Sequence, residues 1–156
     1  PFMMTGTNNM WVNVADSQLH LPTGPATVAR GVVTRLVIPD LNQLAERLEV
    51  TRSMLSGTLF DFRVAPDHVE VICPWGNTFI CHAPDGARFG PYRLWMSEVR
   101  FEVARGAAAP IARFYREVMG AVARADTSNA RVSRRIPSPS RFTGSTRIRA
   151  TQRDGW

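Results

Sequence analysis

The chain contains no lysine, and this absence decides how its charge is interpreted. All 19 basic residues are arginine, against 13 acidic residues, and the net charge is +6. Up to residue 123 the arginines and the acidic residues balance, so the whole excess lies in 124–156, where eight arginines face Asp126 and Asp154. A composition without lysine and rich in arginine and alanine is typical of codon bias. The charge therefore does not indicate a nucleic-acid surface on 1–123.

Cysteine and long hydrophobic runs are also scarce. Two cysteines, Cys73 and Cys81, are too few for a disulfide framework and are typical of buried thiols in a reducing compartment. No apolar run approaches the ~18 residues that a membrane-spanning helix needs. The first residues, Pro1 to Met4, lack the charged and apolar regions of a signal peptide. We therefore expect a cytoplasmic protein that makes no membrane contact.

The motifs that identify many enzymes and nucleic-acid-binding domains are missing. There is no Gly-x-Ser-x-Gly, no phosphate-binding glycine loop and no cysteine spacing for zinc. No RNP-like or helix-turn-helix pattern occurs in the body of the chain. Function must therefore be inferred from the arrangement of strands and helices and from the polar side chains that they carry.

One pattern does recur. The sequence His-x-Pro-x-Gly stands at 20–24 and again at 82–86. Each copy ends an alternating, strand-like run and is followed by a strand and then a helix, over 31–48 and 98–119. A recurrence at this spacing predicts a duplicated module, and the two copies would enclose a cleft.

The central segment predicts a complete βαβββ module. Residues 31–38 are rich in β-branched side chains and predict a strand. Asp40 is a suitable N-cap for a helix whose apolar positions are Leu41, Leu44, Ala45 and Leu48. Three further strands are predicted at 58–64, 68–73 and 78–82, the last two joined by a turn that contains Gly76 and Asn77.

The flanking segments predict parts of the same module. Residues 1–30 would supply the last two strands of a preceding module, 31–90 a complete one, and 91–123 the first strand and helix of a further one. Residues 124–156 are rich in Ser, Thr, Pro, Gly and Arg, and predict a disordered tail. The expected fold is thus α+β, with paired βαβββ modules forming a cupped mixed sheet that is incomplete at both ends.

Three segments resemble motifs of the vicinal oxygen chelate superfamily, which includes glyoxalase I, extradiol dioxygenases and bleomycin resistance proteins. The first is the hairpin 9–22. The second is the turn 73–77, Cys-Pro-Trp-Gly-Asn, which is similar to the family's Asp-Pro-x-Gly-Asn turn. The third is 107–121, whose Ile-Ala-Arg-Phe-Tyr is similar to a family helix. The resemblance covers about 5–121 and implies a divalent metal inside a cupped sheet.

The resemblance also implies which residues would bind that metal. Carried over position by position, it assigns His20 and Glu98 as ligands of a divalent ion such as Fe, Mn, Zn, Ni or Mg. His82, two residues beyond the matching position, would be a third ligand. Two expected ligand positions hold Val33 and Ile80, which cannot ligate. The alternative is that His20 and His82 are strand-end residues held by backbone hydrogen bonds. Reserve donors are Gln18, His68, Glu70 and Glu102.

Two functions follow from these expectations. The first is a metal-dependent enzyme, an isomerase, lyase or dioxygenase, whose metal holds the vicinal oxygens of a small substrate. The second is a metal-free protein that binds a small molecule, as bleomycin resistance proteins do. In either case Trp11, Gln18 and Trp75 would line the ligand pocket. The sequence singles out no catalytic residue beyond the metal ligands.

The expected partners follow from the same features. A small-molecule substrate or ligand is the first. A second copy of the chain would cover the sheet edges that incomplete modules leave open. A third alternative is a protein partner or RNA bound through the arginine-rich segment 124–156.

Overall fold

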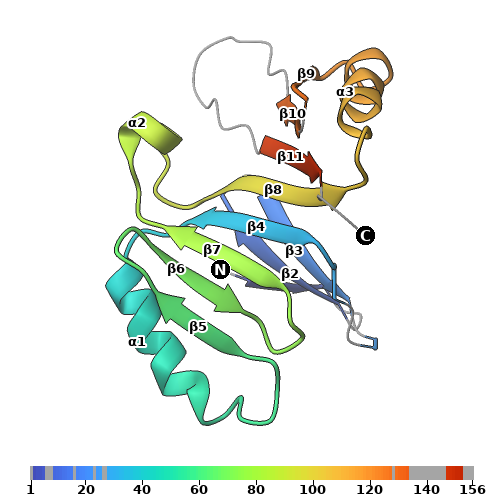
Figure 1. Cartoon of the computed structure of the whole chain (residues 1–156). Helices are drawn as coiled ribbons and strands as arrows, with labels where there is room; N and C mark the ends of the chain where they lie inside the picture. The colour runs from blue at the N-terminus through green and yellow to red at the C-terminus, as the bar shows by residue number, and fades with distance from the viewer. Residues whose placement is uncertain are drawn as a thin grey trace. The chain divides into compact units, whose positions relative to one another are not determined.

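The computed structural model describes residues 2–5, 9–15, 17–22, 24–25, 28–127, 129–133 and 147–152 (Figure 1). The chain divides into two compact units. The first unit comprises Pro1–Ala29 and Arg35–Met96, and the second comprises Arg30–Thr34 and Ser97–Trp156. Among the described residues, no helix is long and apolar enough to span a membrane.

The first unit begins with a small antiparallel sheet. Its strands are β1 (Phe2–Thr5), β2 (Asn9–Val14) and β3 (Ser17–Pro22), in the order β1-β2-β3. The hairpin predicted over 9–22 is therefore present, and Trp11 pairs with His20 across it. Ala15 turns the chain with a φ of 54°, a left-handed conformation that is uncommon for a residue with a side chain.

The same unit contains the βαβββ element order expected for the centre of the chain. Its elements are β4 (Val32–Val37), α1 (Leu41–Arg52), β5 (Asp61–Val64), β6 (His68–Ile72) and β7 (Thr78–His82), with β4 in this unit from Arg35 onward. The strands lie in the order β5-β6-β7-β4, and the β5–β6 and β6–β7 pairs are antiparallel. The predicted strand at 58–64 is shorter in the structure, since it begins at Asp61.

Local side-chain chemistry explains where these elements begin and turn. Asp40 caps α1 by accepting a hydrogen bond of 2.9 Å from the backbone N–H of Gln43. Gly76 has a φ of 92° in the β6–β7 turn, and a Cβ there would lie 3.0 Å from Leu59 Cδ1. Only glycine fits that turn without strain, so Gly76 determines which residues of β6 and β7 face each other. Val37 and Val69 are the largest fully buried side chains.

A second βαβββ set follows in the second unit. After the short helix α2 (Gly86–Phe89) of the first unit come β8 (Trp95–Val103), α3 (Ala108–Glu117), β9 (Val122–Ala125), β10 (Asn129–Ser133) and β11 (Arg147–Gln152). The strand order is β8-β11-β10-β9. The sheet is mixed, because β11 is parallel to β8 while β9, β10 and β11 pair antiparallel. This is the same internal order as β4-β7-β6-β5 in the first set.

The structure differs from the expectation for 124–156. That segment was predicted to be disordered, whereas its described residues carry the end of β9 and all of β10 and β11. For 128, 134–146 and 153–156, which lie outside the described residues, the expectation stays a prediction. The reason is the size of its core residues. Ala123, Ala130 and Val132 are buried against Ala108 and Ala112 of α3, and together they form the core of this unit. Small side chains bury little area each, so they leave a weak hydrophobic signal in a sequence dominated by arginine.

The division into modules also differs. The last module does not stop at residue 123, because β10 and β11 follow it. The duplication lies in the two βαβββ sets, and not in the His-x-Pro-x-Gly pattern, whose copies adjoin β3 of one sheet and β7 of another. The expected α+β class with βαβββ modules and a mixed sheet is confirmed.

Candidate functional site

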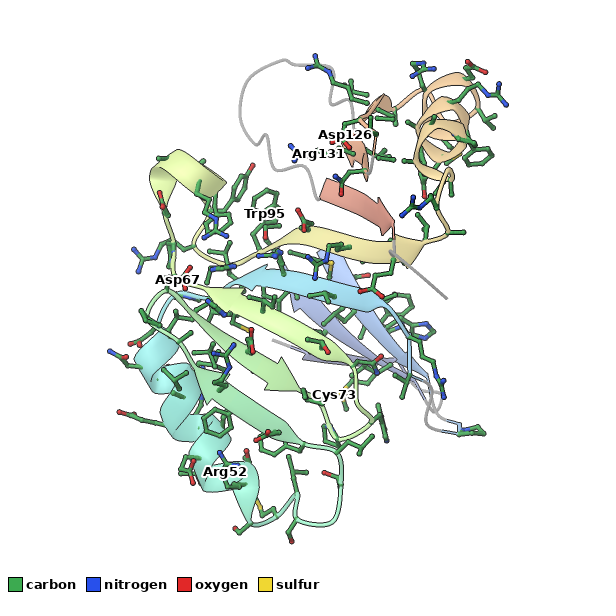
Figure 2. The ribbon with its side chains drawn as sticks, viewed as in Figure 1. Arg52, Asp67, Cys73, Trp95, Asp126 and Arg131 are labelled. Atoms are coloured by element: carbon green, nitrogen blue, oxygen red, sulfur yellow. The ribbon has the colours of Figure 1, made fainter. Side chains whose placement is uncertain are left out.

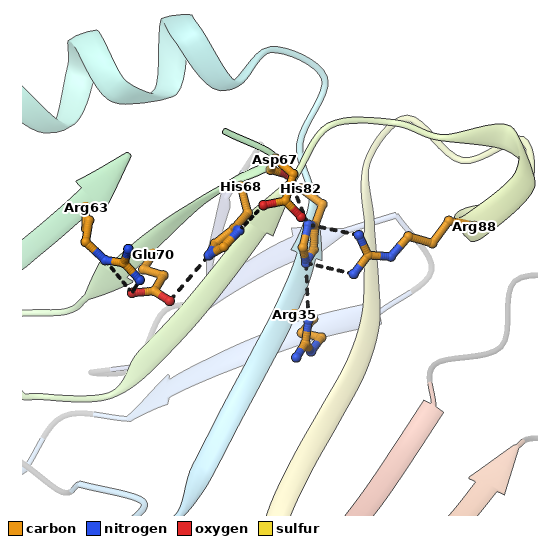
Figure 3. A network of polar contacts seen from close by, with 7 residues as sticks. All are labelled: Arg35, Arg63, Asp67, His68, Glu70, His82 and Arg88. Atoms are coloured by element: carbon orange, nitrogen blue, oxygen red, sulfur yellow. Dashed lines mark hydrogen bonds and ion pairs between the residues drawn. The ribbon is translucent and has the colours of Figure 1, made fainter. Parts of the chain in front are cut away.

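Several titratable side chains lie close together at one end of the β6–β7 hairpin. His68, the first residue of β6, lies directly opposite His82, the last residue of β7, with ring centroids 5.5 Å apart. Asp67 precedes His68 in the turn from β5. Arg35 reaches this end from β4 and Arg88 from α2 (Figure 3). We call Arg35, Asp67, His68, His82 and Arg88 the His82 cluster.

His68 is bound on both sides by carboxylates. Its Nδ1 lies 2.6 Å from Asp67 Oδ1, and its Nε2 lies 3.3 Å from Glu70 Oε1. The other oxygen of Glu70 forms an ion pair of 2.8 Å with Arg63. The hydrogen bond from Arg63 lowers the pKa of Glu70, and the hydrogen bond from His68 lowers the pKa of Asp67. On this side of the cluster, the carboxylates of Asp67 and Glu70 therefore alternate with the hydrogen-bond donors His68 and Arg63.

His82 faces the opposite kind of environment. Its side chain is buried, with 3% of the residue exposed. Arg35 Nη1 lies 3.3 Å from its Nε2, and Arg88 spans the ring, with Nη2 3.4 Å from Nε2 and Nη1 3.5 Å from Nδ1. The backbone carbonyl of Asp67 lies 3.3 Å from Nδ1. Two guanidinium groups thus contact one imidazole.

These contacts determine whether the His82 ring is charged and which of its nitrogens carries the hydrogen. Burial lowers its pKa, and the positive charges of Arg88 and Arg35 lower it further. The neutral ring carries one N–H, and only the Nδ1–H tautomer suits the surroundings. In that tautomer Nδ1–H donates to the Asp67 carbonyl while Nε2 accepts from a guanidinium. His82 is therefore a neutral hydrogen-bond acceptor surrounded by cations.

The cluster has to be tested as a metal site, because the resemblance implies one. Asp67, His68 and His82 each offer a ligand atom, and these atoms lie within 4.8 Å of one another. However, all four ring nitrogens already contact carboxylate, carbonyl or guanidinium groups. A divalent ion would also meet two guanidiniums, and unit charges about 4 Å apart repel by ~4 kcal/mol at an effective dielectric constant of 20. The residues present do not fit a cation in this arrangement.

The metal ligands expected from the sequence lie on three different strands, and their grouping as a set stays a prediction. His82 joins the cluster, but His20 lies on β3, where its ring stacks on Trp11 at 4.2 Å between centroids and an interplanar angle of 16°. Glu98 lies on β8 in the second unit. The metal group found among the described residues contains neither His20 nor Glu98.

Of the residues expected to line a pocket, Trp11 and Gln18 lie on the paired strands β2 and β3, and Trp75 lies in the turn between β6 and β7. Trp11 is half-buried and stacks on His20. Gln18 is exposed and donates a hydrogen bond of 2.8 Å to Asn13 Oδ1. Trp75 is 48% exposed in the turn between β6 and β7. A ligand pocket formed by these three residues stays a prediction.

Sequence reasoning missed the arginines of the cluster and treated His68 only as a reserve donor or a turn residue. One signal could have found the histidine pair. In a hairpin whose turn spans 73–77 and is centred on Trp75, His68 and His82 are equally distant from the turn and face each other. Arg35 and Arg88 carry no such signal, because their approach depends on how β4 and α2 lie beside this hairpin.

Comparisons with known proteins find relatives only among solved structures. No protein-family model matches the chain, and no curated protein matches it. One similar structure is a glyoxalase/bleomycin resistance protein/dioxygenase superfamily member from Vibrio splendidus 12B01, at 14% identity and a TM-score of 0.43, covering 78% of this chain and 97% of that one. Another is a lactoylglutathione lyase from Agrobacterium tumefaciens, at 12% identity and a TM-score of 0.28, covering 77% and 90%.

Proposed function

We propose that this chain binds a small anion without a metal ion, at the guanidinium groups of Arg35 and Arg88 beside His82. The observation that carries the proposal is the contact of two guanidiniums with one buried, neutral imidazole. Like charges that lie close together repel one another, and an anionic ligand beside Arg88 would reduce that repulsion. Of the two functions expected from the sequence, this corresponds to the metal-free binding protein.

Arg88 is the residue best placed to meet the ligand. It is exposed, and its guanidinium lies 4.8 Å from the centroid of the Phe89 ring. Phe89 in turn packs against His82, with ring centroids 5.5 Å apart. The Arg88 guanidinium thus lies against the rings of Phe89 and His82. A guanidinium fixed in this way binds carboxylate or phosphate through two parallel hydrogen bonds.

His82 would respond to the ligand by taking up a proton. A negative charge beside the ring favours the imidazolium form, which opposes the lowering of its pKa by burial and by Arg88. The protonated ring would then donate from Nε2 to the ligand while Nδ1–H keeps its contact with the Asp67 carbonyl. Anion binding and proton uptake are therefore coupled in this proposal.

The competing function is the metal-dependent enzyme, with His20, Glu98 and His82 as ligands. Its support among the described residues is the Asp67, His68 and His82 group. Metal content after equilibrium dialysis against Mn²⁺ or Zn²⁺ separates the two functions. The proposal expects far less than one ion per chain, with no change in His82→Ala or His20→Ala. A stoichiometric ion that either variant loses would support the enzyme and contradict the proposal.

Anion binding is tested by isothermal titration calorimetry with inorganic phosphate and with oxalate at constant ionic strength. Losing a hydrogen bond to a charged group costs about 1.5–3 kcal/mol, so Arg88→Gln should weaken binding by roughly tenfold or more. Arg93→Gln is the matched control, because Arg93 is another exposed arginine close in the chain. Equal losses in the two variants, or no binding by the unmodified chain, would contradict the proposal.

A further inference from the structure

We propose that the second unit binds single-stranded nucleic acid along a row of arginines that crosses its sheet. Arg124 of β9 lies directly opposite Arg131 of β10. Arg131 lies opposite Arg149 of β11, and Arg149 lies opposite Arg100 of β8. Four adjacent strands therefore place arginine at the same level, in a continuous row that we call the arginine row. This site is separate from the His82 cluster and does not depend on it.

The arginine row lies on the face of the sheet that α3 does not cover. Residues directly opposite each other in neighbouring strands share one face, and successive residues of a strand alternate between faces. Ala130 and Val132 are buried in the core that α3 covers, so Arg131 between them points to the other face. Arg124 and Arg131 are exposed, and Arg100 is half-buried.

Aligned like charges need an explanation, because they destabilise a sheet. An opposite-charge pair at such positions contributes roughly 0.2–1 kcal/mol, and a like-charge pair costs free energy instead. The arginine row contains three such pairs in succession, Arg124 with Arg131, Arg131 with Arg149, and Arg149 with Arg100. A polyanion laid across the row would turn this repulsion into attraction.

The acidic residues near the row lie at its β8 end and beside it. Glu98 and Glu102 flank Arg100 on the same face of β8 and are aligned with Arg147 and Thr151. Asp126 stands in the β9–β10 turn, where its carboxylate accepts a hydrogen bond of 2.7 Å from the backbone N–H of Asn129. Among the described residues, no acidic residue is aligned with Arg124 or Arg131, so the row stays positive where it crosses β9 and β10.

The dimensions of the row favour a linear phosphodiester. Neighbouring strands lie about 4.8 Å apart, so four aligned positions span ~14 Å. A row of this length can contact several successive phosphates of one strand. It is a single residue wide, which suits an extended chain better than a compact anion. Arginine also binds phosphate through two hydrogen bonds at once.

The charge of the whole chain points to the same ligand. The net charge is +6, and its excess lies in 124–156, the segment that supplies most of the row. A positive field of this kind speeds the encounter with a polyanion. No motif for reading bases occurs in the sequence, so the contact would be to the backbone and independent of base sequence.

Fluorescence anisotropy with a labelled oligouridylate of about 12 nucleotides tests this proposal over a range of salt concentrations. Arg124→Gln with Arg131→Gln removes two phosphate contacts, so the slope of log K against log salt should fall by ~1.4 and the affinity with it. The matched control is Arg113→Gln with Arg116→Gln on α3, which carries the same net charge. The control should keep the slope of the unmodified chain.

A thermal unfolding scan accompanies the binding measurement. Removing like-charge repulsion should leave the Tm of the Arg124→Gln, Arg131→Gln variant unchanged or raise it. The single variant Arg131→Gln should show a smaller effect on binding and on Tm in the same direction. Equal losses of binding in the row and control variants would assign the binding to net charge and overturn the proposal. Salt-insensitive binding by the unmodified chain, or equally tight binding of an oligoglutamate of the same charge, would also overturn it.

Discussion

His68 and His82 face each other across the β6–β7 hairpin with their rings 5.5 Å apart, yet their surroundings have opposite charge. His68 contacts the carboxylates of Asp67 and Glu70, whereas His82 contacts the guanidiniums of Arg35 and Arg88. One pair of identical side chains at identical register positions therefore has two different chemistries. The difference comes from the elements that approach each ring, and it is visible in the close view (Figure 3), while Figure 2 labels Asp67 at this end of the hairpin.

Arg88→Gln should raise the pKa of His82. The charge of Arg88 is the second largest cause of the low pKa of this group, after burial, and glutamine removes it without deleting the side chain. NMR titration of the ring protons measures the change. Arg93→Gln, which alters an exposed arginine nearby, should leave the titration of His82 where it is. A pKa that stays the same in Arg88→Gln would mean that the guanidinium does not act on the ring.

Stability should fall as the pH drops below the ordinary pKa of histidine because of His82. Its folded-state pKa is lowered from 6.5, so from about pH 6.5 down to that lower value the unfolded chain binds more protons than the folded chain. The free energy of unfolding therefore rises with pH in this window. Urea unfolding at several pH values measures the slope, which should be shallower in His82→Gln. An unchanged slope in His82→Gln would contradict the claim that His82 causes this pH dependence.

Asp67 and Glu70 affect stability in a separate and more acidic window. Their folded-state pKa values are lowered from 3.8 and 4.5, so their contribution is present above those values and is lost as the pH falls through the folded pKa values. His82→Gln should leave this acidic limb in place, which allows the same unfolding series to separate the two effects.

Cys81 should resist alkylation in the folded chain, and Cys73 should react first. Cys81 is 4% exposed, and burial raises the pKa of its thiol to about 11, so little reactive thiolate forms near neutral pH. Cys73 is half-buried. Mass spectrometry after timed exposure to iodoacetamide measures both sites, with urea-unfolded chain as the control in which the two react alike. Equal rates in the folded chain would show that Cys81 is accessible.

Val132→Ala tests whether the C-terminal strands form a core with α3. Val132 is 5% exposed in β10 and packs with the buried alanines, so deleting its two methyl groups should cost about 1–2 kcal/mol of stability. Val118→Ala is the matched control, because Val118 is 67% exposed at the end of α3 and should change stability by less than ~0.5 kcal/mol. Chemical unfolding measures both, and equal small effects would contradict the packing of β10.

The predictable part of the fold is the part with large, periodic side chains. The β-branched run of β4, the Asp40 cap with its leucine spacing, and the Gly76 turn each determine a local structure without help from distant residues. β10 was not predictable in this way. Its buried residues are the small Ala130 and Val132, and the exposed residue between them is Arg131, so its composition resembles that of a disordered segment.

The candidate site also has a part that the sequence predicts and a part that it does not. The turn register makes the meeting of His68 and His82 predictable, since both lie at fixed distances from Gly76. The convergence of Arg35 and Arg88 was not predictable, because it depends on tertiary placement and arginine is common throughout the chain. The expected grouping of His20 with His82 came from the family resemblance, and the two residues lie on strands of different sheets.

The most direct test of the account follows the His82 ring by NMR while inorganic phosphate is added at constant ionic strength. If two arginines present this neutral imidazole to an anion, the ring signals should shift in a saturable way and the pKa of His82 should rise toward its ordinary value. Both changes should shrink in Arg88→Gln. Ring signals that do not shift with phosphate but shift stoichiometrically with Zn²⁺ would contradict anion binding at the His82 cluster and identify the cluster as a metal site.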